Sequence, residues 1–266
     1  MSLQALHTAA TGMEAYQFKL DNTANNLANA GTTAFKRQRV NFEDLFYQHY
    51  KLPGAQDAQG NLTPTGVALG LGTRVQSTAV EHTQGSLIET NQQFDVAIEG
   101  DGFFQVQDGN ETLYTRAGNF TINDQGQLVL QSANKGRLTN PPISIPNTYD
   151  RIQITSDGNV NAFIGDQDTP TNLGTITTAR FINPQGLIQR GENLYAVSAA
   201  SGDPSLGTPG EDGRGMLIQG FLEASNVEPV RELVDLIKTQ RNFELNSQVL
   251  QAADQTLQLV ANLRRF

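Results

Sequence analysis

Residues that could do chemistry are sparse in this chain, and their spacing fits no catalytic or metal-binding pattern. The histidines His7, His49 and His82 lie far apart in the sequence and match neither an HExxH pattern nor paired metal-ligand spacing. The chain has no cysteine, which excludes a thiolate zinc site, an iron–sulfur cluster, a disulfide framework and a cysteine nucleophile. We therefore expect no metal site and no cofactor.

Other motifs that could carry chemistry have simpler structural interpretations. Ser86 lacks the second flanking glycine of a nucleophile elbow, and the glycine-rich residues 66–72 lack the Lys and Ser or Thr that complete a phosphate-binding loop. The basic cluster Lys36-Arg37-Gln38-Arg39 is predicted to be a solvated turn rather than a grip for phosphate. The sequence shows no catalytic constellation, and we expect a protein that is not an enzyme.

The net charge of −9 over 266 residues is concentrated in the middle of the chain. Residues 1–50 hold four basic and four acidic residues, and residues 228–266 hold five of each, so the whole excess of acid lies in residues 51–227. An acidic chain of this kind is not expected to bind nucleic acid by neutralising phosphates. There is no run of about 18 apolar residues to span a membrane, and the N-terminal residues do not resemble a cleaved secretory signal.

Proline and glycine positions predict helices at both ends of the chain. All ten prolines lie between Pro53 and Pro229, and no glycine follows Gly220. Gly31 is expected to adopt a left-handed conformation where the first helix stops, and Ser225 or Asn226 is expected to cap the start of the last helix.

The middle of the chain reads as β structure. Between residues 94 and 223, ten short apolar or alternating runs are separated by turn signals such as Asp101-Gly102 and Asp157-Gly158, which is typical of antiparallel strands. Residues 42–75, which precede these runs, look extended and loop-like. The predicted fold class is α+β, with discontinuous terminal helices around a central, mainly antiparallel β domain.

Both predicted helices carry apolar seams with heptad-like spacing. The C-terminal helix has a second apolar row beside its seam, and a pair of helices within one chain can bury only one seam on each helix. The second row stays in water unless other copies cover it, so we expect self-assembly through the chain ends; helices that fold back as the second layer of a sheet are the alternative. The N-terminal seam comprises Leu3, Leu6, Ala10, Met13, Gln17, Leu20, Ala24 and Leu27, the C-terminal seam Leu236, Phe243, Leu250 and Leu257, and the second row Leu245, Val249, Ala252, Thr256, Leu259 and Leu263.

Motifs along the chain resemble those of the bacterial flagellar rod and hook axial protein family. The N-terminal signature is Ala24-Asn-Asn-Leu-Ala-Asn-Ala30 with Thr33-Ala-Phe-Lys36, and the C-terminal signature runs from Gly220-Phe-Leu-Glu-Ala-Ser-Asn-Val227 to Gln240-Arg-Asn-Phe-Glu244. Residues 95–105, 114–120 and 191–195 look like the β-domain motifs of the same family. The resemblance covers essentially the whole chain. Residues 42–47, 53–56 and 66–75 are similar to the stretch that distinguishes distal-rod subunits from hook and proximal-rod subunits.

The resemblance implies a structural subunit that polymerises into a stiff tubular drive shaft and transmits torque from the motor to the hook. Its terminal helices are expected to form a coiled coil that lines an inner tube. The expected partners are copies of itself, proximal rod proteins, the hook protein, the surrounding P and L rings, and the flagellar type III export apparatus. The implied location is the flagellar basal body, from the periplasm to the outer membrane, reached without a cleaved signal peptide.

The resemblance also assigns roles to residues. Asn25, Asn26 and Asn29 join the seam residues as self-assembly positions, and residues 47–64 form a distal-rod-like segment that is expected to stiffen the rod. The expected organisation is a helical domain of residues 1–35 and 225–266, an extended connecting stretch of residues 36–85, and a β domain of residues 86–224. The stiffening positions are Tyr47, Pro53, Gly54, Ala55, Gln56 and Pro64.

Two alternatives stay open at this point. One is another rod or hook axial protein. The other, from a different class, is a stalked β-domain protein that binds or hydrolyses cell-wall polymers, because a pair of carboxylates for glycoside hydrolysis can come from any part of a chain.

Overall fold

The computed structural model describes residues 2–54, 56, 62–132, 134–146, 148–164 and 170–263. The chain divides into two compact units: a helical unit (Met1–Ala28, Gln38–Val80, Glu228–Phe266) and a β unit (Asn29–Arg37, Glu81–Val227). The α+β class, with helices from the chain ends and an antiparallel β body between them, is confirmed. The predicted boundaries at residues 35, 85 and 225 stay predictions. Within the described residues, neither helix has the length and apolar content that membrane crossing requires.

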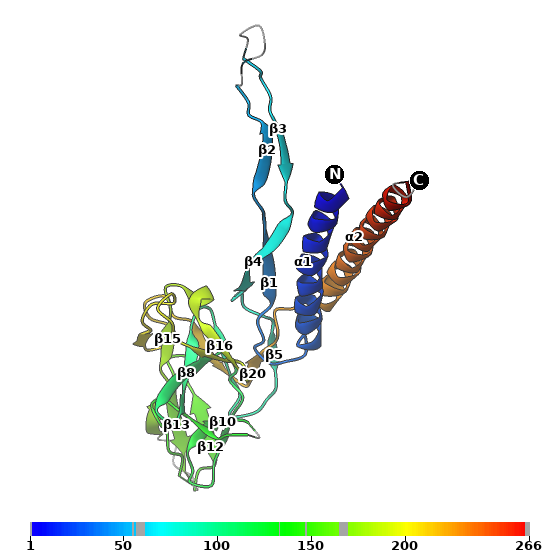
Figure 1. Cartoon of the computed structure of the whole chain (residues 1–266). Helices are drawn as coiled ribbons and strands as arrows, with labels where there is room; N and C mark the ends of the chain where they lie inside the picture. The colour runs from blue at the N-terminus through cyan, green and yellow to red at the C-terminus, as the bar shows by residue number, and fades with distance from the viewer. Residues whose placement is uncertain are drawn as a thin grey trace. The chain divides into compact units, whose positions relative to one another are not determined.

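The helical unit is built on two long helices that run antiparallel. Helix α1 spans Ser2–Ala28 and helix α2 spans Pro229–Leu263. Gly12 in the first half of α1 lies against Asn246 in the middle of α2, while Asn26 near the end of α1 hydrogen-bonds Glu232 at the start of α2. Consistent with these contacts, the start of α1 and the end of α2 lie at the same end of the pair (Figure 1).

Both predicted helix-end residues behave differently from expectation. Gly31 does not take a positive φ; the left-handed residue after α1 is Ala34, at φ 58°. Helix α2 begins at Pro229, and the side chain of Asn226 is engaged by other segments rather than capping it. The hydroxyl of Ser225 accepts a hydrogen bond from the Val227 amide instead, at 3.2 Å. The cap prediction was therefore wrong, because long-range partners claim Asn226.

Strands pair within the stretch that was predicted to be loop-like. Strand β1 (Gln38–Asp44) pairs antiparallel with β4 (Thr73–Val80), and β2 (Tyr47–Lys51) pairs antiparallel with β3 (Val67–Gly70). These four strands form one ribbon, which we call the arm (Figure 1). The prediction of an extended course is thus correct and the prediction of a loop is wrong.

A glycine is required where the arm passes α1. Gly72 has φ +120°, a conformation that L side chains rarely adopt, and a Cβ there would collide with the hydroxyl of Thr11. The arm therefore approaches α1 closely at Gly72, between β3 and β4. Helix α1 also contacts β1 and β4.

In the described residues, the strands of the β unit pair antiparallel. In the described residues its largest sheet has nine strands, in the order β16-β17-β8-β7-β11-β10-β9, with β15 pairing β7 and β18. A three-stranded sheet, β12-β13-β14, and the pairs β6–β19 and β5–β20 complete it. The strands are β5 Leu87–Glu89, β6 Val96–Glu99, β7 Phe103–Asp108, β8 Glu111–Thr115, β9 Phe120–Ile122, β10 Leu128–Leu130, β11 Arg137–Thr139, β12 Arg151–Ile154, β13 Asn159–Phe163, β14 Thr171–Thr175, β15 Thr178–Arg180, β16 Ile188–Gly191, β17 Leu194–Ala196, β18 Ser205–Gly207, β19 Met216–Gln219 and β20 Phe221–Glu223, with a 3-10 turn at Pro184–Gly186.

Each of the ten predicted runs overlaps a strand, and the last contains two. Gly220 (φ +78°) separates β19 from β20, so the predicted run of residues 216–223 pairs first with β6 and then with β5. The strands β5, β11, β14, β16 and β18 were not predicted, because they are short and lack a run of apolar residues.

Apolar side chains of the strands form the core of the β unit. Val96, Ile98, Phe104 and Val106 from β6 and β7 are fully buried in it. A smaller aromatic cluster places the rings of Tyr114 and Phe181 4.9 Å apart, edge to face. This core holds the strand ends that carry the charged residues described next.

Candidate functional site

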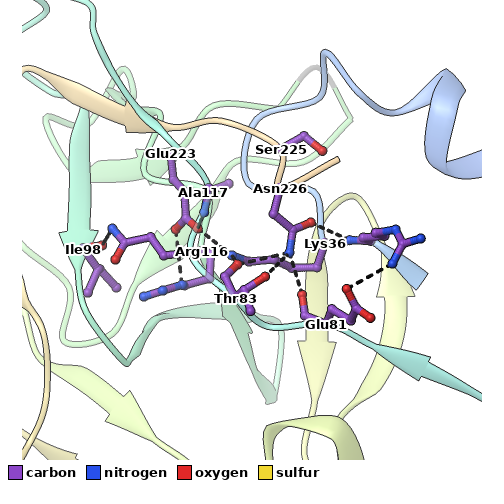
Figure 2. A network of polar contacts seen from close by, with 12 residues as sticks. Lys36, Glu81, Thr83, Ile98, Arg116, Ala117, Glu223, Ser225 and Asn226 are labelled. Carbon is purple, nitrogen blue, oxygen red and sulfur yellow. Dashed lines mark hydrogen bonds and ion pairs between the residues drawn. The ribbon is translucent and has the colours of Figure 1, made fainter. Parts of the chain in front are cut away.

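Sequence motifs that lie far apart in the chain meet in one buried polar network of the β unit. Figure 2 shows Lys36, Arg116, Glu223 and Asn226, which come from three different motifs, together with Glu81 and Thr83. We call these six residues the junction network. They lie where the chain enters and leaves the β unit, since Arg37, Glu81 and Val227 are border residues of that unit.

The centre of the network is an ion pair without solvent contact. The Lys36 Nζ lies 2.5 Å from the Glu223 Oε1, and both side chains are 0% exposed. The Arg116 Nε lies 3.3 Å from the other carboxylate oxygen, and the Gly85 amide donates to Oε1 at 2.9 Å. Burial lowers the pKa of Lys36, while the Glu223 carboxylate acts in the opposite direction. The prediction that Lys36 belongs to a solvated turn was therefore wrong.

Arg116 connects this ion pair to the turn between β6 and β7. Its guanidinium donates to the carbonyl oxygens of Gly102 and Gly100 at 2.9 and 2.8 Å, so it fixes the backbone on both sides of Asp101. Burial lowers the pKa of Arg116, and the nearby Glu223 carboxylate offsets this. The Nε, Nη1 and Nη2 atoms of Arg116 thus each lie against an oxygen atom of the protein.

The N-terminal signature is held by two further motifs. The Ala34 amide donates to the Glu223 carbonyl oxygen at 2.8 Å, and the Asn193 side chain donates to the Thr33 carbonyl oxygen at 2.8 Å. Glu192 and Asn193 both have positive φ, at 53° and 58°, in the turn between β16 and β17. This less common conformation directs Asn193 to the signature segment.

His82 lies beside the network in an apolar, positively charged environment. Its ring is 5.6 Å from that of Phe103 and 5.5 Å from that of Tyr195, and within the described chain its buried Nδ1 has no hydrogen-bond partner. Burial, followed by the charges of Lys36 and Arg116, lowers the pKa of His82 to about 4. His82 is therefore neutral at pH 7.

We expect the β unit to lose stability in acid because of His82. The unfolded state takes up a proton near pH 6.5 and the folded state only near pH 4, so stability is fully present above pH 6.5 and is lost as the pH falls towards 4. The expected loss is about 2 to 3 kcal/mol. Urea unfolding followed by tyrosine near-UV circular dichroism between pH 7.5 and 4 measures it. His82→Gln should reduce the loss and His49→Gln should not; an equal loss in the His82 variant would contradict the assignment.

The helix faces hold the other predicted site residues. The buried side of α1 consists of small or polar residues, Ala9, Gly12, Ala15, Thr23 and Asn26. The predicted seam of α1 lies beside this face and stays partly exposed at Leu6, Met13, Leu20 and Leu27. The seam of α2 is half-buried at Leu236, Phe243, Leu250 and Leu257. The side chains of Leu3 and Leu263 lie outside the described part of the structure.

The predicted asparagines differ in where their side chains lie. Asn26 is buried; its Nδ2 donates to the Gln38 carbonyl oxygen at 2.8 Å and its Oδ1 accepts from the Gln38 amide at 3.0 Å. The Asn29 Oδ1 accepts from the Thr32 hydroxyl at 3.1 Å, and Asn25 is exposed. These contacts are within the chain, and a role of the asparagines in self-assembly stays a prediction.

The second row of α2 is exposed at its described leucine and valine positions. Leu245, Val249 and Leu259 are 58%, 50% and 64% exposed. Sequence analysis missed a continuation of this apolar surface in the first half of α2, although its three- and four-residue spacing was a usable signal. The additional exposed residues are Val230, Leu233, Val234 and Ile237.

The arm also exposes apolar and aromatic side chains. Phe46 is 87% exposed, and Tyr47 and Tyr50 are more than half exposed. Among the predicted stiffening positions, Pro53, Gly54, Gln56 and Pro64 are exposed, and the Gly54 amide donates to the Thr63 carbonyl oxygen at 2.8 Å. Ala55 and residues 57–61 lie outside the described residues. The structure therefore places Tyr47 on β2 and the other described stiffening positions beyond it.

Taken together, this geometry supports holding and packing rather than catalysis. The buried Glu223 carboxylate contacts both the Lys36 ammonium and the Arg116 guanidinium, and in the part of the chain that the structure describes no group of three or more His, Asp or Glu side chains could hold a metal ion. The exposed apolar rows on α2 and the arm are surfaces available for contact with other molecules.

Comparison with known protein families finds matches along most of the chain. A family described as flagella basal body rod protein matches residues 6–36, the flagellar hook protein FlgE/F/G D1 domain matches residues 97–162, and the flagellar basal body rod FlgEFG protein C-terminal family matches residues 218–263. Lys36 lies in the first match, Arg116 in the second, and Glu223 and Asn226 in the third.

Individual relatives match over nearly their full length. The flagellar basal-body rod protein FlgG of Buchnera aphidicola subsp. Baizongia pistaciae is 44% identical over 263 residues, which cover 98% of this chain and 100% of the relative. The protein of the same name from Caulobacter vibrioides is 44% identical over 264 residues, with the same coverage. That from Bacillus subtilis is 36% identical over 266 residues, covering 99% of this chain and 100% of the relative.

Proposed function

This chain belongs to the flagellar basal-body rod protein family, and from that premise we propose that it is a structural subunit of the distal rod. In this proposal many copies polymerise into a stiff tubular shaft that transmits torque from the motor to the hook. The observation that carries the proposal is the apolar surface along α2, at Leu245, Val249 and Leu259, which stays exposed in the single chain. Monomeric proteins rarely leave such a continuous surface in water, whereas neighbouring copies in a polymer can cover it.

Electron microscopy of basal bodies tests this function directly. Cells that carry this chain as the sole distal-rod subunit should build a rod, and a version without α1 and α2 should build none. A defined small oligomer of the purified protein at all concentrations, together with no rod in cells, would contradict the proposal.

We infer that the arm stiffens the polymer by wedging between adjacent copies. A two-stranded ribbon is at best marginally stable alone in water, and this one exposes Phe46, Tyr47 and Tyr50. Packing against neighbours would remove these side chains from water and brace each copy against bending. Tyr47, Pro53, Gly54, Ala55, Gln56 and Pro64 are the positions proposed to do so.

Deleting residues 47–64 should convert a straight rod into a curved or more flexible one. The reason is that the deletion removes β2 and the residues beyond it while α1 and α2 stay unchanged. Curvature and persistence length measured by electron microscopy check this result. A rod as straight as that of the intact chain would contradict the stiffening role.

The basal-body family membership supports self-assembly and association with other flagellar components. We propose that these are the proximal rod proteins, the hook protein, the P and L rings and the flagellar type III export apparatus. The proposed location extends from the periplasm to the outer membrane, with export that uses no cleaved signal peptide. We further propose that the chain catalyses no reaction, in keeping with a family of structural rod proteins.

A further inference from the structure

The chain passes between the helical unit and the β unit next to residues 28, 37, 80 and 227. At each passage a single segment of the chain connects the two units, which we call a border segment. A force on the helices can therefore reach the β unit through these border segments. What holds the border segments together at the border of the β unit therefore decides how firmly that unit is held. The side chain of Asn226 lies at this border.

The side-chain amide of Asn226 binds two other border segments and so joins three, its own included. The Asn226 Oδ1 accepts from the Arg37 amide at 2.7 Å. Its Nδ2 donates to the Glu81 carbonyl oxygen at 2.8 Å and to Thr83 through the hydroxyl at 2.9 Å and the carbonyl oxygen at 3.1 Å. Asn226 lies on the segment that leaves the β unit after Val227. It connects this segment to the one that leaves after Arg37 and to the one that re-enters at Glu81 (Figure 2).

The same segments are joined by contacts that surround the amide. The Glu81 amide donates to the Arg37 carbonyl oxygen at 2.9 Å, and their side chains form an ion pair at 3.3 Å. The Lys36 Nζ donates to the Thr83 carbonyl oxygen at 2.7 Å while it binds Glu223. The buried ion pair therefore supports the border from inside the β unit.

We propose that Asn226 is a positioning residue that clamps these three border segments. The clamp keeps the segments from moving relative to one another when load passes from the helices to the β unit. The inference rests on the proposed function as a torque-bearing rod subunit and adds the residue that makes the junction stiff. A primary amide supplies the acceptor for Arg37 and the donors for Glu81 and Thr83 at once. An aspartate lacks the donors, and an alanine lacks both.

Hydrogen exchange of the full chain tests the clamp. In Asn226→Ala, the Arg37 amide should exchange about 10-fold faster or more, because its acceptor is gone, and the Glu81 amide should follow. Amides in β7 and β8 should change less than about 2-fold, since they report unfolding of the whole unit. An unchanged Arg37 amide, or an equal rise throughout the β unit, would overturn the proposal.

The matched control is Asn183→Ala, which removes one exposed asparagine hydrogen bond in the same unit, to the Ala200 carbonyl oxygen at 3.0 Å. It should leave the Arg37 amide unchanged. Thr83→Val is the milder second variant, because it removes only the hydroxyl that Asn226 contacts, and it should speed the Arg37 amide about 3- to 5-fold. If the alanine variant does not fold, the absence of this increase in Thr83→Val overturns the clamp.

Rod mechanics separate the clamp from the proposed function. Asn226→Ala subunits should still build rods, and these should bend more and turn the hook less effectively than rods with the Asn183→Ala control. Straight Asn226→Ala rods with unchanged motility would overturn the clamp. Failure of the unsubstituted chain to build rods would instead overturn the proposed function, and the exchange result on the single chain would still decide whether Asn226 holds the border.

Discussion

Glu223→Gln should destabilise the β unit by about 3 to 5 kcal/mol, the range found when one partner of a buried ion pair is removed. The substitution leaves the Lys36 ammonium and the Arg116 guanidinium facing a neutral amide, with both side chains almost completely buried. Hydrogen exchange of the β7 and β8 amides measures the effect, because it reports the free energy of unfolding of this unit separately from that of the helices.

The two cations make the single and double variants differ in an informative way. Lys36→Met should cost less than Glu223→Gln, since it leaves the carboxylate paired with Arg116 at 3.3 Å. Adding Lys36→Met to Glu223→Gln should then recover part of the lost stability, because it removes one of two unneutralised charges. The double variant should therefore be clearly more stable than the sum of the single effects predicts.

Glu111→Gln is the matched control for this cycle. Glu111 pairs with Arg190 at 3.2 Å in the same unit, but both side chains are more than half exposed. The same chemical change should shift the free energy of unfolding by no more than about 0.5 kcal/mol there. If both Glu to Gln substitutions changed the free energy of unfolding equally, burial of the Glu223 ion pair would not account for the effect, and the prediction would be wrong.

Leu245→Asp should prevent rod assembly while leaving the single chain folded. Leu245 is 58% exposed, so an aspartate costs the free chain little, whereas in a polymer it would place a carboxylate in an apolar contact. Losing the burial of this exposed part alone removes about 1 to 2 kcal/mol per copy. Electron microscopy of basal bodies measures assembly, and far-UV circular dichroism and exchange of the β7 and β8 amides show whether the chain is folded.

Gln251→Asp controls for the added charge and for the lower helix propensity of aspartate. Gln251 is exposed on α2 six residues after Leu245 and lies on a different side of the helix from the apolar row. This variant should assemble normally. Normal rods from Leu245→Asp, or equal failure of both variants, would contradict the role of the exposed row.

Local sequence patterns predicted the elements well, because helices and strands follow short periodicities. Proline-free, glycine-poor ends gave α1 and α2, and alternating runs gave most strands of the β unit. Strands such as β16 and β18 escaped prediction, since short polar segments become strands only through the partners that pair with them. The strands of the arm were not predicted for the same reason, because β1 pairs with β4, which lies well beyond it in the sequence.

The junction network was beyond sequence reasoning for a different reason. Lys36 looked like one member of an exposed basic cluster, and only the fold brings it to Glu223, 187 residues later in the chain. No local pattern in the sequence shows that Lys36 lies beside Glu223. The burial of these two side chains depends on how β5, β20 and the N-terminal segment pack together in the β unit. The resemblance of the motifs to a family marked Lys36, Glu223 and Asn226 without stating what they contact.

The sequence by itself determined that this chain has long helices at its ends, an acidic β body between them, and more apolar surface on the last helix than one chain covers. These properties follow from composition and periodicity, which act over a few residues. Tertiary structure decided which side of α1 is buried, that Lys36 is an internal charge, and that Asn226 holds three border segments rather than capping a helix. Those outcomes depend on contacts between segments that are distant in the sequence. Such contacts stabilise the protein only after folding has brought the segments together and excluded water between them.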